Sequence, residues 1–579
     1  MTAPSNSLKE NDHKPELQSR VPQLDRRSTN LPDSTNIGLN TGVILSSAAA
    51  ALSSLNFGWC LGEPNIPEDV IRNCIKGPQN LINGLPTCLP MGHTMWGLFV
   101  GLVALGALVG SLFAGRAADQ FGRKYILLVN NVFFITGALL LGTSTTFAQL
   151  AVGRFVSGIG CSAILNDSKT KKCSGVASTV VATYNSECAP VKVRGLIGTV
   201  LQLSVEVGIF LAQLIAVFLV EVPNWRILFG LSGVISIVQL AWLPFMPESP
   251  KFLIVHGMRA EAARALQFLR PNHDISIEFQ AMLDLASGVS SAADNGHIAD
   301  CVDKISFVPD SSSECNELPS KPKTSVASIS SVLGTNTPTS VGVVAIFKGQ
   351  TPDTIWHLLF CTMFLMGFQQ WTGTKGIVFY STGILAKMFS LSPTQLRETP
   401  NTAQWVTIGL AATGIIAVLS SMSLIDRLGR RRLLLISTSG LAMACLLIVI
   451  GCACNVPVLA VLAMFAFKLT YGLGMAPIPW LTASEMLPYY TLGTLSGIAS
   501  ALNWTMIFVV GLLFPALSRL LGDYLFVPFA ALNFCAFVVV LLMVPETKNR
   551  HISDILFHHG KRIHIVFSMV WKRQSEGQV

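Results

Sequence analysis

The chain has 579 residues, of which 51% are hydrophobic and only 12% are charged, and its mean hydropathy is +0.54. A soluble domain carries about a quarter of its residues as charged side chains, so this composition excludes an ordinary soluble protein. The formal net charge of +8 comes from basic residues that border apolar segments. That placement is typical of membrane topology signals, and it does not indicate a nucleic-acid partner.

The first forty residues are polar and basic and contain proline, which predicts a disordered cytosolic tail over 1–40 and no signal peptide. Long apolar runs follow. A helix rises 1.5 Å per residue and a hydrocarbon core is about 30 Å thick, so each run is nearly or fully long enough to cross a bilayer. Inside lipid the backbone must satisfy its own hydrogen bonds, which predicts helices, about twelve in all. The clearest runs are 41–62, 96–114, 125–141, 196–220, 227–245, 356–388 and 433–452.

Basic residues gather after the second predicted span, after the eighth and in the C-terminal tail, whereas the opposite loops hold little Lys or Arg. This asymmetry places both termini in the cytosol and requires an even number of spans. The bilayer is therefore the first predicted partner. The basic residues are Arg116, Arg123, Lys124, Arg427, Arg430, Arg431, Arg432, Lys548, Arg550, Lys561, Arg562, Lys572 and Arg573.

The segment 162–173, SAILNDSKTKKC, interrupts the fourth predicted span. Each charged residue in it would cost about 2.5–3.5 kcal/mol at the centre of a membrane helix. Removing the segment restores a continuous apolar helix. We therefore favour a retained intron or an error in the gene model, and a messenger RNA that always encodes the segment would contradict this interpretation.

Thirteen cysteines occur in the chain, mostly within apolar runs, where free cysteine behaves as a small hydrophobic residue. Cys74 and Cys88 share the first outward loop. They are able to pair in an oxidising lumen, and the sequence leaves both states open.

Six spans precede residue 247 and six follow residue 354. We expect an N-terminal six-helix bundle over 41–246, a cytosolic linker over 247–354, a C-terminal six-helix bundle over 355–544 and a cytosolic tail over 545–579. Within the linker, 251–270 predicts an amphipathic helix. The part from about 287 to 341 is rich in Ser, Pro, Asn and Thr and predicts disorder.

Two patterns recur at matching places in the halves. Gly122-Arg123 after the second span corresponds to Gly429-Arg430 after the eighth, and PESPK at 247–251 after the sixth corresponds to PETK at 545–548 after the twelfth. A duplicated six-helix unit explains both repeats. Such duplicates place the solute near the midplane, between halves that rock around it.

Nine motifs occur in the order found in one family. They are Asp119-x-x-Gly122-Arg123-Lys124, Gly153-Arg154, Tyr184-x-x-Glu187-x-x-Pro190-x-x-x-Arg194-Gly195, PESPK at 247–251, Gln369-Gln370-x-Thr372-Gly373, Asp426-Arg427-x-Gly429-Arg430-Arg431, Pro477-Ile478-Pro479-Trp480 with Glu485, Asn503-Trp504 and PETK at 545–548. With them the chain resembles the sugar porter branch of the major facilitator superfamily, which includes facilitative glucose transporters and sugar–proton symporters. The resemblance implies an all-α polytopic membrane protein with twelve transmembrane helices in two pseudo-symmetric six-helix bundles, the major facilitator fold, and transport by alternating access.

The resemblance also assigns gating charges to the cytosolic helix ends. There they are expected to pair, to cap helices and to latch the halves in the outward-facing state, each exposed pair contributing about 0–1 kcal/mol. The alternative is that they only fix topology. The set is Asp119, Arg123, Arg154, Glu187, Arg194, Glu248, Asp426, Arg427, Arg430, Glu485 and Glu546. Leu492 replaces an arginine of the family, so we expect unequal latches in the two halves.

A sugar site needs uncharged donors and acceptors, with aromatic rings against the apolar face of the ring. Five residues match the family's sugar contacts, and an interhelical hydrogen bond is the alternative role for each amide. They are Gln202, Gln369, Gln370, Trp480 and Asn503.

Three positions depart from the family. Lys375 stands where the family has Asn, Gly414 replaces an Asn of the eighth span, and Gly472 replaces a glutamate of the tenth. The predicted site has therefore lost amides and gained a cation. This departure leaves room for an acidic sugar or another small anion.

Energy coupling is the remaining question. Proton-coupled relatives carry an Asp where this chain has Cys60, which favours facilitated diffusion. Glu63, one turn further on, and Glu206, inside the fifth span, are nevertheless candidates for coupling to protons, because a buried acid in a membrane is a functional candidate by default. We hypothesise that Glu63, Glu206 and Lys375 share one electrostatic site. The alternative is a purely structural Glu206–Lys375 pair.

The sequence predicts transmembrane transport of a small polar solute, a hexose or pentose first, in a protein that works as a monomer. The alternatives are a nutrient receptor that does not transport, or a carrier of a polyol or sugar acid. No HExxH, GxSxG or Walker motif occurs in the cytosolic segments, so no enzyme activity, catalytic residue, metal or cofactor is predicted. The expected membrane is the plasma membrane, with a vacuolar or other endomembrane as the alternative.

Overall fold

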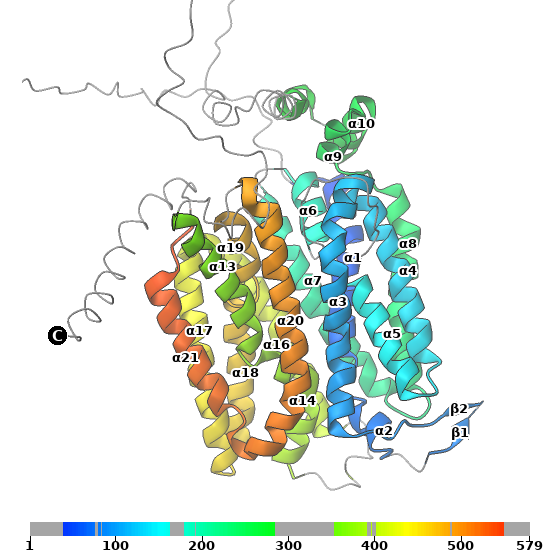
Figure 1. The fold of residues 1–579 in the computed structure, drawn as a ribbon, viewed down its shortest axis with the longest axis vertical. Helices are drawn as coiled ribbons and strands as arrows, with labels where there is room; N and C mark the ends of the chain where they lie inside the picture. Colours follow the sequence, from blue (N-terminus) through cyan, green and yellow to red (C-terminus); the bar gives the residue numbers. More distant parts are fainter. Residues whose placement is uncertain are drawn as a thin grey trace, which may run out of the picture.

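A computed structural model describes residues 39–75, 79–82, 84–161, 179–190, 193–271, 273–283, 353–390, 395, 401–486 and 489–548. Its helices stand in two groups side by side, one from each half of the chain (Figure 1). The first group contains α1 (Thr41–Gly62), α3 (His93–Phe121), α4 (Arg123–Gly142), α5 (Phe147–Gly160), α6 (Thr179–Cys188), α7 (Arg194–Leu219) and α8 (Trp225–Trp242). The second contains α13 (Asp353–Trp371), α14 (Thr374–Met388), α16 (Thr402–Leu428), α17 (Arg430–Ala453), α18 (Pro457–Leu473), α19 (Ile478–Met486), α20 (Tyr489–Leu521) and α21 (Val527–Met543).

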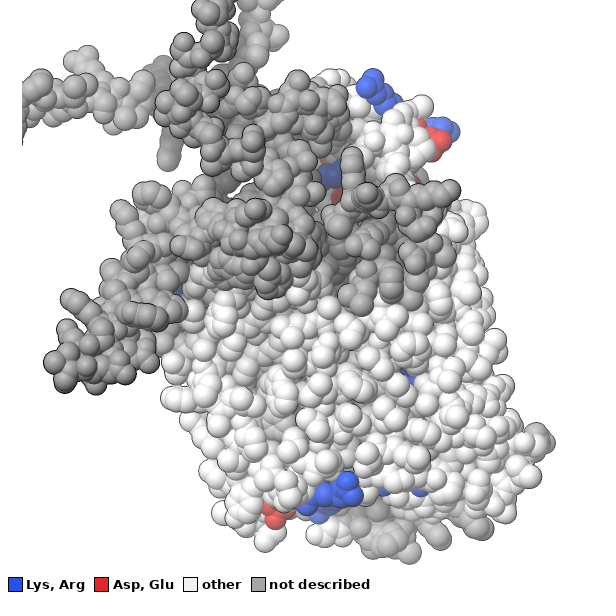
Figure 2. All heavy atoms as spheres, in the orientation of Figure 1, with Lys and Arg blue, Asp and Glu red and all other residues white. Residues whose placement is uncertain are grey.

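The described helices form a membrane protein. Nine of them are long and apolar enough to cross a bilayer, and α21 is a shorter apolar helix. The visible surface is almost free of charge between its two ends (Figure 2), as contact with lipid requires. The predicted all-α polytopic fold is therefore confirmed.

The two ends of the bundles carry different elements (Figure 1). The end with α9 (Pro250–Val255) and α10 (Arg259–Leu269) is called the linker side here. The end with α2 (Glu68–Arg72) and the strands β1 (Leu81–Ile82) and β2 (Leu85–Pro86) is called the hairpin side. The strands pair antiparallel, and a disulfide joins Cys74 to Cys88, whose Cα atoms are 5.5 Å apart.

Two predicted helices are each divided in the structure. The run 251–270 forms α9 and α10 rather than one helix, because the chain turns at 256–258, where Gly257 has a φ of +77°. The run 356–388 is broken between α13 and α14, where Gly373 has a φ of +99°. The segment 162–173, the predicted disordered parts of the linker and both predicted tails lie largely or wholly outside the described residues.

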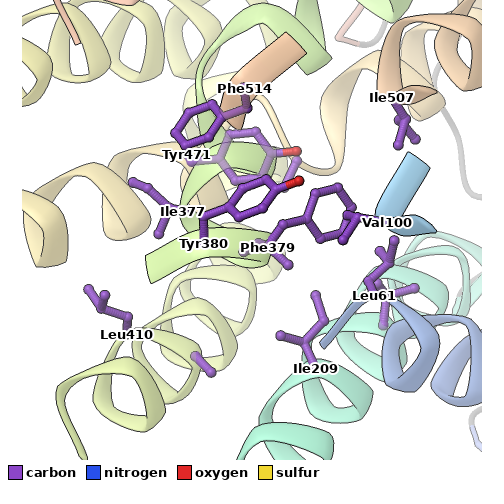
Figure 3. Packing of buried hydrophobic residues seen from close by; sticks show 14 of the residues in the cluster. Leu61, Val100, Ile209, Ile377, Phe379, Tyr380, Leu410, Tyr471, Ile507 and Phe514 are labelled. Atoms are coloured by element: carbon purple, nitrogen blue, oxygen red, sulfur yellow. The ribbon is translucent and has the colours of Figure 1, made fainter. Parts of the chain in front are cut away.

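The halves meet along two pairs of helices, α3 with α20 and α7 with α16. A continuous cluster of buried apolar residues joins them. Figure 3 shows part of it, with Leu61, Val100 and Ile209 of the first half facing Phe379 and Tyr380 of α14. Tyr380 stacks on Phe514 of α20 at 5.2 Å between ring centroids. This packing fixes α14 against the first half.

Candidate functional site

A cavity lies between the two groups of helices and is lined by residues from both. It holds about 820 Å³ of space that no protein atom fills, part of it open to solvent. All five predicted sugar contacts line it, and so does Lys375. The remaining polar and aromatic lining residues are Ser53, Ser54, Phe57, Asn130, Cys161, Tyr471 and Trp504.

The side chain of Gln369 connects the end of α13 to the break between α18 and α19 and to α20. Its Nε2 donates to the carbonyl oxygens of Met475 and Ala476 at 2.8 and 2.9 Å, in the break between α18 and α19. Its Oε1 accepts from Gln370 Nε2 at 3.1 Å and from Asn503 Nδ2 at 2.9 Å. Both ends of this amide are therefore occupied by protein groups, and its first role is to position its neighbours.

Gln370 has an acceptor that is available to a solute. It is 3% exposed, and its Oε1 has no hydrogen-bond partner among the described residues. Because a buried acceptor without a partner is costly, a hydroxyl of a solute in the cavity is a suitable donor for it. Trp480 and Trp504 supply aromatic surface in the same cavity.

Replacing Gln369 with Leu should destabilise the protein, because the buried carbonyl groups of Met475 and Ala476 lose their donor. Each group left without a partner costs about 1–3 kcal/mol. Gln370→Leu is the matched comparison, since the Gln370 side chain makes only one hydrogen bond among the described residues, and it should change solute affinity more than stability. Thermal unfolding in detergent, with and without solute, separates the two. An equal loss of Tm in both variants would contradict this assignment.

A buried ion pair connects the halves at the level of the cavity. Lys468 Nζ of α18 lies 2.9 Å from Glu206 Oε2 of α7, and each side chain is 3% exposed. The prediction that Glu206 pairs with Lys375 is therefore wrong, because the ion-pair partner of Glu206 is Lys468. Lys468 was not among the predicted site residues.

Gly414 provides the space for this pair. A Cβ at Gly414 would lie 2.4 Å from Glu206 Oε2 and 2.6 Å from Lys468 Cε. The departure from the family at this position thus has a physical reason. Gly472 is similarly confined, because a Cβ there would lie 2.4 Å from the Cβ of Ala417.

Glu63 belongs to a second buried ion pair and not to a common site with Glu206 and Lys375, so that part of the hypothesis is wrong. Arg154 Nη1 donates to Glu63 Oε1 at 2.6 Å and to the carbonyl oxygen of Cys60 at 2.8 Å. Both charged side chains are 0% exposed. The guanidinium also lies over the ring of Phe99, 4.9 Å from its centroid.

Arg154 was grouped with the charges at the cytosolic helix ends, and this grouping is also wrong. Arg154 is in the middle of α5 and makes its bonds to the hairpin-side end of α1. Its pair with Glu63 lies inside the first half, outside the residues that line the cavity.

The linker-side charges cap helices. Glu248 accepts from the backbone N–H groups of Arg123 and Lys124 at 3.0 Å, at the start of α4. Burial raises the pKa of Glu248, and these N–H groups together with that of Ser249 oppose the rise. Arg123 Nε lies 3.1 Å from Glu187 Oε2. The anionic cap at a helix N-terminus is favourable because of the helix dipole.

The second half repeats the arrangement. Glu546 accepts from the backbone N–H groups of Arg430 and Arg431 at 2.9 and 3.2 Å, and Arg430 pairs with Glu485 at 3.0 Å and Asp426 at 3.5 Å. Arg427 is exposed. A Cβ at Gly122 or Gly429 would lie 2.4 or 2.6 Å from the capping carboxylate, which explains the glycine in both copies of the motif.

The ion pairs of Arg123 with Glu187 and of Arg430 with Glu485 and Asp426 each join helices of one half, so these pairs do not latch the halves together. The side chains of Asp119 and Arg194 lie outside the described part. The halves are instead joined on the hairpin side. Asn65 Nδ2 donates to the carbonyl oxygen of Val378 at 2.9 Å and to Ser381 Oγ at 2.8 Å.

Several lining residues were not predicted as site residues. Tyr471, Asn130 and Trp504 line the cavity, although Trp504 belongs to a motif that was recognised. A signal for Lys468 was present, because a lysine inside an apolar membrane run is itself a functional candidate, although its position does not show which acid it pairs with. No group of three or more His, Cys, Asp or Glu side chains in the described chain is arranged to hold a metal.

Two helix bundles with matching end caps and a polar cavity between them define a multi-pass membrane carrier of the alternating-access class. The chain belongs to the sugar (and other) transporter family, whose model matches residues 37–302 and 319–556.

Individual relatives agree with this family. The chain is 29% identical to a probable metabolite transport protein of Saccharomyces cerevisiae, over 88% of this chain and 93% of the relative. It is 30% identical to the facilitated glucose transporter member 5 of solute carrier family 2 of Homo sapiens, over 80% of each chain. Among solved structures, the xylose transporter XylE of E. coli in a partially occluded inward-open conformation matches with a TM-score of 0.63 and 17% identity, over 88% of this chain and 100% of that one.

Proposed function

We propose that the protein carries a monosaccharide or a close derivative across a membrane by alternating access. The observation that carries the proposal is the cavity between the halves, whose lining combines amides from α7, α13 and α20 with indole rings from α19 and α20. Amides supply both donors and acceptors for hydroxyl groups, and indole rings cover the apolar face of a sugar. The relatives named as glucose and xylose transporters support the same substrate class.

We also propose that the linker side faces the cytosol, as the distribution of basic residues indicates. With Asn65 bonded to α14 on the hairpin side, the described form is then closed toward the outside. In the opposite form, open toward the outside, the charged residues of the linker side would pair between the halves and not only within each half. The plasma membrane is the proposed location, with an endomembrane as the alternative, and the working unit is a monomer.

Uptake into proteoliposomes that contain the purified full chain tests the proposal. Labelled D-glucose, D-fructose and D-xylose should equilibrate faster than into liposomes without protein, and labelled L-glucose serves as the control for leakage. Repeating the assay under a pH gradient, with and without a proton ionophore, tests coupling. If the ionophore leaves equilibration of the sugar unchanged, transport is facilitated diffusion. If the ionophore abolishes accumulation of the sugar, transport is proton symport. Saturable binding without any uptake would contradict the carrier proposal and identify a receptor.

A further inference from the structure

Three charged side chains gather where the halves meet beside the cavity. Glu206 and Lys468 are each 3% exposed and Lys375 is 8% exposed. They come from α7, α18 and α14. The set contains one carboxylate and two ammonium groups, so its formal charge is +1 within the described residues.

The carboxylate is already engaged. Glu206 Oε2 lies 2.9 Å from Lys468 Nζ, and Gly414 leaves just enough space for this pair. Lys375 interacts electrostatically with both members. Lys375 makes no hydrogen bond and no close ion pair with any residue that the structure describes. The second cation is therefore not compensated by a partner of its own.

Lys375 belongs to the wall of the cavity, together with Gln369, Gln370 and Asn503. An ionised group buried in a membrane protein is costly unless it is paired. A charge that faces a solute cavity can be paired by the solute itself. Because Lys375 supplies a single charge in excess, one negative charge on the solute is sufficient.

The backbone at this place also favours an anion. Lys375 is the second residue of α14, which begins inside the bundle after the break at Gly373. The N-terminus of a helix carries a partial positive charge, and such ends inside transporters face anionic groups of their substrates. The helix terminus and the unpaired ammonium thus act in the same direction.

We propose that the preferred solute is a sugar acid with one carboxylate, of the hexuronate type. Its carboxylate binds the Lys375 ammonium at the start of α14, and a hydroxyl donates to the free Oε1 of Gln370. This inference rests on the proposed function, because it assigns the substrate class of the same cavity.

Ligand-induced thermal shifts and proteoliposome uptake with the full chain test the inference, with D-glucuronate, D-glucose and D-glucose 6-phosphate as probes. D-Glucuronate should raise the Tm more than D-glucose does. Lys375→Asn, which restores the residue of the family, should weaken D-glucuronate binding at least tenfold and leave or improve D-glucose binding. Lys375→Arg should keep D-glucuronate binding.

The controls separate a local effect from a general one. Lys387→Gln removes a lysine at the exposed far end of α14 and should behave as the unaltered protein. Gln370→Glu keeps Lys375 but supplies an internal carboxylate, so it should also abolish D-glucuronate binding, which keeps the test decisive if Lys375→Asn does not fold.

The possible results are distinct. D-Glucose bound as well as D-glucuronate, or an unchanged D-glucuronate affinity in Lys375→Asn, would overturn the inference and leave the proposed function standing. A preference for D-glucose 6-phosphate would overturn the carboxylate class. Uptake of none of the sugars or acids would overturn both proposals.

Discussion

Glu206→Met is expected to destabilise the protein by about 3–5 kcal/mol, because the Lys468 ammonium remains buried without its partner. Lys468→Met should have an effect of similar size, since it leaves the Glu206 carboxylate unpaired. The double variant removes both charges and should recover most of the loss, as replacement of a buried pair by uncharged groups of similar volume is often neutral. Thermal unfolding of the four proteins in one detergent gives the coupling energy of the pair.

The same cycle tests the link between the halves. The pair joins α7 to α18, so the double variant should separate the halves more readily and change the rate of sugar exchange while keeping the fold. Lys387→Gln, on the exposed end of α14, should change stability by less than about 0.5 kcal/mol. Single variants as stable as the unaltered protein would show that the pair is not formed.

Arg154→Met should lower the free energy of unfolding by a similar amount, about 3–5 kcal/mol, because it leaves the Glu63 carboxylate buried at 0% exposure without a partner. It also removes the contact of the guanidinium with the ring of Phe99. Glu63→Gln is the milder variant, since Gln can still accept a hydrogen bond from Arg154. Its Tm should lie between those of Arg154→Met and the unaltered protein.

Glu63→Gln also decides whether this pair couples transport to protons. If Glu63 carries a proton, the variant should equilibrate the solute but lose accumulation driven by a pH gradient. Measuring accumulation and exchange in the same vesicles distinguishes this from a structural role, for which accumulation would persist at reduced stability. An unchanged accumulation ratio would exclude Glu63 as the coupling acid.

The sequence predicted the fold well because hydrophobic length and the placement of basic residues are local signals. The run 41–62 coincides with α1. The break between α13 and α14 was missed, because long apolar stretches flank the polar residues around Gly373 on both sides, and the positive φ of Gly373 is visible only in the structure. Gln369 and Gln370 were found because their motif places them on the second half's first span.

The partners of the buried charges were not predictable in the same way. Glu206 and Lys468 are 262 residues apart, and spacing along the chain says nothing about contacts between distant helices. Lys375 was chosen as the partner because it follows a recognised motif, whereas Lys468 lies in an apolar run without one. Arg154 was misplaced for the opposite reason, since its motif suggested a helix end although apolar residues flank it on both sides.

The confined space at Gly414 has a consequence for the ancestry of this carrier. A Cβ at Gly414 would lie 2.4 Å from Glu206 Oε2 and 2.6 Å from Lys468 Cε, so a larger residue there would force the ends of both side chains to move, and we expect glycine to be inherited together with the pair. Orthologues that share the substrate should keep Glu206, Lys375, Gly414 and Lys468 together. If a survey of orthologues finds that these four residues vary independently of one another, this expectation is wrong.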